Sequence, residues 1–278
     1  MLHLAGCAGR AGYPAGKAIF GNACNEPLAS LVPRPITFFT HFLFAMKNLL
    51  LPALLWLASL APSLAQTTRE VRPVPTFHAL EVSSGIELHL VAGDTQRVEV
   101  SADTPENQAR IQTTVEGGVL KVKYDILKSQ PWRRDHRGRL QAYVTAAQLT
   151  GLQASSGSEL RVEGPYPTAD LQLGVSSGAQ LRGEFSATSI AARLSSGAEA
   201  VVSGSTQRLE VHTSSGASFT GRNLVATECQ ASASSGASVA VAVQKTLSAE
   251  ASSGGSVSYA GSPVVAKHTS SGGSVSSH

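Results

Sequence analysis

The sequence predicts an all-β protein built as a single-chain parallel β-helix. The tripeptide Ser-Ser-Gly occurs eight times, ending at Gly85, Gly157, Gly178, Gly197, Gly216, Gly236, Gly254 and Gly272. From Gly157 onward the steps between triplets are 21, 19, 19, 20, 18 and 18 residues. Apolar and polar residues alternate on both sides of each triplet. A near-constant period combined with two-residue alternation is typical of stacked coils in a solenoid.

Residues 151–278 are predicted to form the repeating coils of about 18–21 residues. Each coil buries only alternate residues, so its core becomes continuous only when coils stack about 4.8 Å apart. The glycines are predicted to be structural corners, because glycine adopts backbone angles that other residues resist. A side chain there is expected to strain the corner and to crowd the stacked coils. The chirality of parallel crossovers favours a right-handed coil.

Strand alternation also predicts which side chains are buried around the corners. Counting in steps of two places the second Ser of each triplet inward, so that Ser215 and Ser235 are expected to be buried. The same count places Gln180 and Glu210 outward.

Residues 76–150 are predicted to form non-repeating strands and hairpins that cap the first coil, because an uncovered coil presents open strand edges. The stretch "IELHLVAGDTQRVEVSA" indicates two strands joined around Gly93-Asp94. Thr104 and Pro105 are suited to cap and open a short helix. The stretch "IQTTVEGGVLKVKYDI" indicates a hairpin turning at Gly117-Gly118, and "LQAYVTA" at 140–146 a further strand.

The segment 46–65 has the features of a secretory signal peptide. Lys47 precedes an apolar run, and Ser63-Leu64-Ala65 provides a small-residue cleavage site before Gln66. Residues 1–45 are interpreted as an over-extended start, with Met46 as the initiator; the alternative is a long leader whose "FFTHFLFA" adds to a membrane anchor. Residues 66–75 form a short linker. The mature chain is therefore expected to be periplasmic, on the cell surface or extracellular, with no integral membrane span.

Composition of the mature chain argues against several classes of function. Four of the 22 basic and one of the 19 acidic residues precede Gln66, which leaves 18 of each sign and no net charge. Neutrality does not favour a nucleic-acid partner. Cys229 is the only cysteine after Gln66, so neither an intrachain disulfide nor a cysteine-rich metal site is expected.

No catalytic, metal or cofactor site is predicted. The acidic residues of the repeats are thinly spread, and seven equivalent serines at the triplets indicate a structural ladder rather than a single nucleophile. The histidines recur at no ligand spacing and are expected to be scattered on the surface: His78, His89, His136, His212 and His268, with His278 terminal. No glycine-rich loop leads into a helix, which argues against a nucleotide site.

One basic segment is a candidate contact for an anionic partner. From Lys128 to Leu140 the sequence reads "KSQPWRRDHRGRL", with five basic residues against one acidic residue. The candidate contacts are Trp132, Arg133, Arg134, Arg137 and Arg139, because arginine forks suit phosphate or carboxylate groups and an indole face suits a sugar. The alternative is a solvated polar loop between two strands.

These patterns resemble the bacterial family described as "putative auto-transporter adhesin, head GIN domain". The motif Gly-Ile-Asn of that family corresponds to Gly85-Ile86-Glu87 in "SSGIELHLVAGD", where Glu87 replaces the asparagine. The corners at about 20-residue steps and the "YAGSPVV" segment at 259–265 match as well. The resemblance covers residues 76–276. It implies an extracytoplasmic location and adhesion, and it assigns no catalytic residue.

The leading hypothesis for function is an exported, non-catalytic binding or scaffold module that engages a surface, glycan or protein partner. One alternative is a polysaccharide-active enzyme, a lyase or hydrolase, with a groove along the β-helix. A second is an ice-binding solenoid, which needs a flat and regular array of exposed hydroxyls; the first serines of the triplets form such a column only one residue wide.

Overall fold

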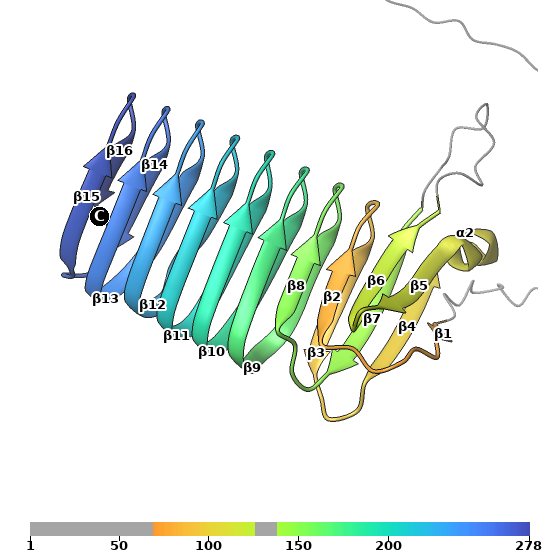
Figure 1. The fold of residues 1–278 in the computed structure, drawn as a ribbon. Helices are drawn as coiled ribbons and strands as arrows, with labels where there is room; N and C mark the ends of the chain where they lie inside the picture. The colour runs from red at the N-terminus through yellow and green to blue at the C-terminus, as the bar shows by residue number, and fades with distance from the viewer. Residues whose placement is uncertain (1–68, 126–137) are drawn as a thin grey trace, which may run out of the picture. The chain divides into compact units, whose positions relative to one another are not determined.

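Each Ser-Ser-Gly triplet lies at a tight turn between two strands, and these turns form one row along the edge of a stack of coils (Figure 1). The computed structural model describes residues 69–125 and 138–278. They form an all-β solenoid of about seven turns, which confirms the predicted fold class. The predicted start, signal peptide and first linker residues lie outside the described residues. Within the described ranges, no helix is long and apolar enough to cross a membrane.

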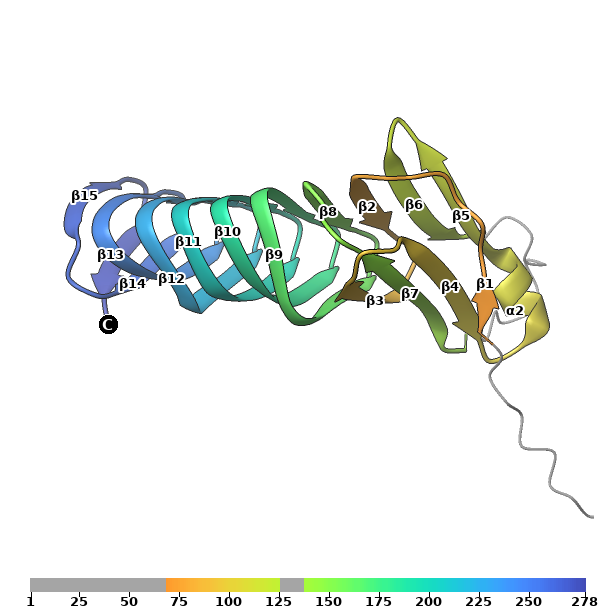
Figure 2. The ribbon, with the colours of Figure 1, turned by 90° about the horizontal axis from the view of Figure 1, so that it is seen from below.

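The repeating coils consist of parallel strands of up to 17 residues that curve around the end of the coil opposite the triplets (Figure 2). Neighbouring coils pair residue by residue, for example Gln180 with Glu199 and Glu199 with Ser218. The strands are β8 (Gly151–Ala154), β9 (Glu159–Val175), β10 (Gln180–Leu194), β11 (Glu199–Thr213), β12 (Ser218–Ala233), β13 (Ser238–Ala251), β14 (Ser256–Ala260), β15 (Val264–Thr269) and β16 (Ser274–Ser277).

Every triplet adopts a turn with two consecutive positive φ angles. The second Ser has φ between 46° and 65° and the Gly between 69° and 76°. In the seven triplets from Ser155 onward the turn is closed by a backbone hydrogen bond, such as that from the Ala217 N–H to the Ser214 carbonyl at 3.1 Å. Positive φ at both central positions defines a type I′ turn, whose twist suits the flanking strands.

The expectation that Ser215 and Ser235 are buried is wrong, because both side chains are exposed. Two-residue alternation holds only for extended backbone, whereas the second Ser lies at the tip of a turn. The alternation is correct for the extended residues on either side: Thr213 and Ala217 are buried. Gln180 is exposed as predicted, and Glu210 is partly exposed.

The turns are joined to one another through their backbones. The amide of Gly197 donates to the Ser215 carbonyl at 3.0 Å, and the amide of Gly216 donates to the Ser235 carbonyl at 3.1 Å. A Cβ added at Gly216 would meet nothing within 4 Å. The expected crowding between coils is therefore wrong, and glycine is favoured here by its positive φ alone.

The strands before residue 150 extend the stack rather than only covering it. They are β1 (Glu70–Val71), β2 (Ala79–Val82), β3 (Glu87–Ala92), β4 (Arg97–Ala102), β5 (Ile111–Glu116), β6 (Val119–Tyr124) and β7 (Leu140–Ala146). Strands β2 and β3 flank the Gly85 triplet and pair in parallel with β8 and β9. Strands β6 and β7 continue the stack by pairing in parallel with β2 and β3. Strand β6 therefore ends, and β7 begins, beside the Gly85 triplet of the adjacent coil.

The non-parallel elements lie at this end of the solenoid. The helix α2 (Pro105–Arg110) is capped by Thr104, whose Oγ1 accepts from the Asn107 amide at 3.1 Å. Strands β5 and β6 form the predicted antiparallel hairpin. The two strands predicted around Gly93-Asp94 exist as β3 and β4, but they do not form a hairpin. β7 lies between them. One edge of β7 pairs in parallel with β3, and its other edge pairs antiparallel with β4.

One apolar core runs through the whole stack, from Phe77 to Tyr259. In one register column a small side chain lies between two large ones, where Ala200 is flanked by Leu181 and Phe219. In β15 the polar Lys267 occupies the inward register position of Ala249, with its Nζ 5.2 Å from the centre of the Tyr259 ring. An inward charge makes this edge a poor template for a further strand.

Candidate functional site

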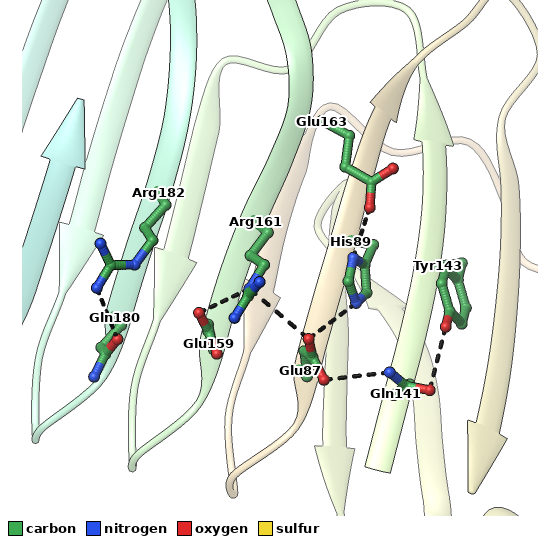
Figure 3. A network of polar contacts seen from close by, with 9 residues as sticks. All are labelled: Glu87, His89, Gln141, Tyr143, Glu159, Arg161, Glu163, Gln180 and Arg182. Carbon is green, nitrogen blue, oxygen red and sulfur yellow. Dashed lines mark hydrogen bonds and ion pairs between the residues drawn. The ribbon is translucent and has the colours of Figure 1, made fainter. Parts of the chain in front are cut away.

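A network of nine polar side chains lies on the face formed by the strand segments that follow the triplets (Figure 3). Strand pairing brings them together, since His89 is in register with both Tyr143 and Arg161. We call it the His89 network. Contacts join Glu87 and His89 on β3, Gln141 and Tyr143 on β7, and Glu159, Arg161 and Glu163 on β9; beside them, Gln180 and Arg182 on β10 contact each other.

His89 is held from several sides. Its Nδ1 lies 2.7 Å from Glu163 Oε1, and its Nε2 lies 3.2 Å from Glu87 Oε1. Its ring stacks on Tyr143 with a centroid separation of 5.0 Å, and the Arg69 guanidinium lies 3.6 Å from the centre of the Tyr143 ring. The His89 side chain is only 14% exposed, so the expectation of a surface histidine is wrong at this position.

Glu87, the residue in place of the asparagine of Gly-Ile-Asn, points outward as its alternation predicts and joins three strands. Its Oε2 accepts from Gln141 Nε2 at 3.2 Å, and Arg161 Nε lies 3.8 Å from its Oε1. Arg161 also donates to Glu159 at 2.8 Å, and this hydrogen bond raises the pKa of Arg161 above its ordinary value.

The network ties the N-terminal strands to the first repeating coil. In an enzyme, a histidine between carboxylates can act as a general acid or base. Here both ring nitrogens of His89 face carboxylates of the network itself, those of Glu87 and Glu163. The contacts span β7, β3 and β9, so the arrangement is suited to fixing strand register. A cavity of about 230 Å³ borders it, lined among others by Arg69, Arg97 and Glu163.

Sequence reasoning missed this network because His89 and Glu163 are 74 residues apart. A signal was present. Aligning the Gly85 triplet with the Gly157 triplet as adjacent coils places Glu87 opposite Glu159 and His89 opposite Arg161, which is the observed register.

The opposite face, formed by the strand segments that precede the triplets, carries two grooves. The first, of about 600 Å³, runs beside the corners from β2 to β12. We call it the serine trench. It is lined by the first serines of five triplets and by the outward residues two positions before them: Ser155, Ser176, Ser195, Ser214 and Ser234, with Glu81, Gln153, Gly174, Arg193, His212 and Ser232.

The second groove, of about 540 Å³, lies farther from the corners across β10 to β13 and β15. Arg208, Glu210 and Glu228 are among its lining residues, and Cys229 lies beneath them at 5% exposure. Burial raises the pKa of the Cys229 thiol to about 12. Cys229 is therefore a protonated core side chain.

The free energy of unfolding should fall in alkaline solution because the buried Tyr166 hydroxyl and Cys229 thiol resist loss of their protons in the folded protein. Burial raises the pKa of Tyr166 from 10.0, and that of Cys229 from 9.0, to about 12 in each case. Their contribution to stability is complete below pH 9 and is lost as the pH rises toward 12, because the unfolded chain releases these protons first. Urea unfolding over this range should show a decline that is shallower in the double variant Cys229→Ala/Tyr166→Phe. Parallel curves for the two proteins would contradict this assignment.

The predicted anion-contact segment lies mostly outside the described residues, which include neither Trp132 nor Arg133, Arg134 and Arg137. Arg139 is described, and it is exposed directly before β7. Across 69–125 and 138–278, no group of three His, Cys, Asp or Glu side chains is arranged to hold a metal ion.

Comparisons with known proteins agree with this architecture. The family model described as "Putative auto-transporter adhesin, head GIN domain" matches residues 76–263. No curated protein matches the chain significantly.

Solved structures share this fold at low sequence identity. A crystal structure of a "putative adhesin" from Bacteroides fragilis has a TM-score of 0.65 at 16% identity, covering 76% of this chain and 95% of that one. A "putative adhesin" from Parabacteroides merdae has a TM-score of 0.60 at 14% identity, with 76% and 95% covered. A "Putative lipid binding protein" from Parabacteroides distasonis has a TM-score of 0.53 at 15% identity, with 77% and 98% covered. With a family match over most of its length, the chain belongs to the family of the auto-transporter adhesin head GIN domain.

Proposed function

We propose that the protein is an exported, non-catalytic, adhesin-like module that binds a surface ligand through the outward faces of its solenoid. The observation that carries the proposal is the serine trench, a groove of about 600 Å³ that crosses six stacked strands and is lined by exposed or half-exposed polar side chains. Regular stacked repeats make such extended binding surfaces by their geometry. Family membership supports the adhesin-like role.

The carboxylates of the His89 network already have partners within the protein, which supports binding over catalysis. Glu87, Glu159 and Glu163 lie on adjacent strands, as the carboxylates of a glycosidase would. Each is already engaged by His89, Gln141 or Arg161. Carboxylates with such partners are suited to a structural role.

Export from Met46 with cleavage after Ala65 belongs to the same proposal, as does docking of an anionic group at Trp132, Arg133, Arg134, Arg137 and Arg139. The signal-like segment supports export. Arginine forks that suit phosphate or carboxylate groups, with an adjacent indole, support docking at this segment.

Binding without turnover is the expected result when the exported chain is tested on bacterial surface glycans, lipopolysaccharide and lipid vesicles. Intact mass of the exported protein should first show a chain that begins at Gln66. A glycan array then reports retention, and chromatography of the recovered glycan reports cleavage. Unchanged glycan supports the module, whereas newly formed reducing or unsaturated ends would identify a polysaccharide-active enzyme. Thermal hysteresis without retention would favour the ice-binding alternative.

A further inference from the structure

We propose that the serine trench binds a linear, neutral polysaccharide that lies along the stack of coils. The inference rests on the proposed binding function and assigns to it a site and a ligand class. The trench crosses the strands from β2 to β12, a span of roughly 24 Å at the usual strand spacing. An extended polymer can therefore contact several coils at once.

The trench contains a column of serines whose backbones are held in place by hydrogen bonds. The amide of Ser195 donates to Val175 of the preceding coil at 3.1 Å, and its carbonyl accepts from Ala198 at 3.2 Å. Ser214 repeats this pattern one coil further on. Among the described residues, neither Ser195 Oγ nor Ser214 Oγ has a hydrogen-bond partner within the protein. Each hydroxyl can therefore donate one hydrogen bond to a ligand and accept others, and stacking sets their spacing.

Beside this column, the planar side chains of Arg193, His212 and Glu210 offer a second set of groups for contact with a ligand. Glu210 Oε1 lies 2.8 Å from His212 Nε2 and 3.8 Å from Arg193 Nη2. Arg193 is 65% exposed and His212 is 42% exposed. The shared carboxylate orients both side chains while it leaves most arginine donors and the histidine Nδ1 available. Such donors and acceptors suit the hydroxyl pairs of a sugar ring.

The lining does not suit a peptide or a lipid chain. Strands β9 to β12 already pair with neighbours on both edges, so a peptide cannot add to them as a strand. The apolar residues Val175 and Leu194 beneath the trench are at most 2% exposed. Protein hot spots and acyl chains both need accessible apolar or aromatic surface.

Charge favours a neutral polymer. Arg193 is paired with Glu210, and Glu81 lies at the β2 end of the trench. The site therefore carries no excess of positive charge for an acidic polymer, whose binding would also weaken strongly with salt.

Calorimetry with the exported chain tests the proposal. The probes are hexasaccharides of a neutral β-1,4-glucan, β-1,4-mannan and β-1,4-xylan, with an acidic galacturonan hexasaccharide for comparison. Ser195→Leu fills the middle of the trench, and its matched control Ser252→Leu alters the same turn position outside the lining. Arg193→Ala is paired with Arg222→Ala, which alters an exposed arginine on β12 that does not line the trench. Thermal melts confirm that all four variants fold.

The expected result is that at least one neutral probe binds at both low and high salt. Ser195→Leu and Arg193→Ala should each weaken this binding about tenfold or more, and the two controls should change it less than about twofold. Equal binding by all variants would overturn the trench assignment and leave the binding module intact. Binding of the galacturonan alone would overturn the neutral ligand. Failure of every sugar would overturn the inference, and retention on lipopolysaccharide or vesicles would then still support the module.

Discussion

Replacing Phe219 by alanine is expected to lower the free energy of unfolding by about 3–5 kcal/mol. Phe219 is 1% exposed, and in the adjacent coils it is in register with Ala200 and Val239. Because Ala200 contributes only a methyl group, it cannot fill the space that the lost ring leaves on its side. The loss should be measured by urea unfolding.

Two controls separate this effect from a general sensitivity of the strand. Phe219→Leu keeps most of the volume and should cost less than half as much, whereas Thr220→Ala changes the adjacent outward residue and should cost little. A loss of less than about 1 kcal/mol for Phe219→Ala would show that the coils do not pack in this register.

Gly204→Ala should be the second strongly destabilising change, with a cost of about 3 kcal/mol or more. Gly204 has φ of +108°, and a Cβ there would collide with the carbonyl oxygen of Phe185 in the preceding coil. Backbone in the middle of a parallel stack cannot move aside without breaking ladder hydrogen bonds.

The matched substitution Gly216→Ala should cost only about 1–2 kcal/mol, because its φ is also positive but its surroundings are open. Thermal melts of the two variants would compare strain with collision directly. Equal losses would contradict the distinction between corner glycines, which need only their backbone angle, and Gly204, which also needs the absence of a side chain.

Much of the fold could be predicted from the sequence because the triplets mark the turn of each coil and alternation marks its inner face. Predictions failed where a local rule ended. Ser215 is exposed because strand alternation does not extend through a type I′ turn. The two strands joined around Gly93-Asp94 were predicted, but nothing in the sequence indicated that β7, which begins at Leu140, lies between them.

The candidate site was less predictable, because its parts come together only through stacking. Arg193 and His212 are unremarkable in sequence until their coils are aligned. The same holds for His89 and Glu163. The triplet at Gly85 carried the needed register, but it stands 72 residues before the next one and was assigned to a capping region instead of to the stack.

Hydrogen exchange at the corners tests most directly whether the Ser-Ser-Gly triplets are stacked structural turns. The amides of Gly178, Gly197, Gly216 and Gly236 donate to carbonyls of the next coil. In the described structure, the amide of the second Ser of each of these triplets, directly before the Gly, has no such bond. NMR-detected exchange should therefore show protected glycine amides beside fast-exchanging serine amides in the same turns. Fast exchange of the glycine amides, with the strands still protected, would contradict the stacked corners.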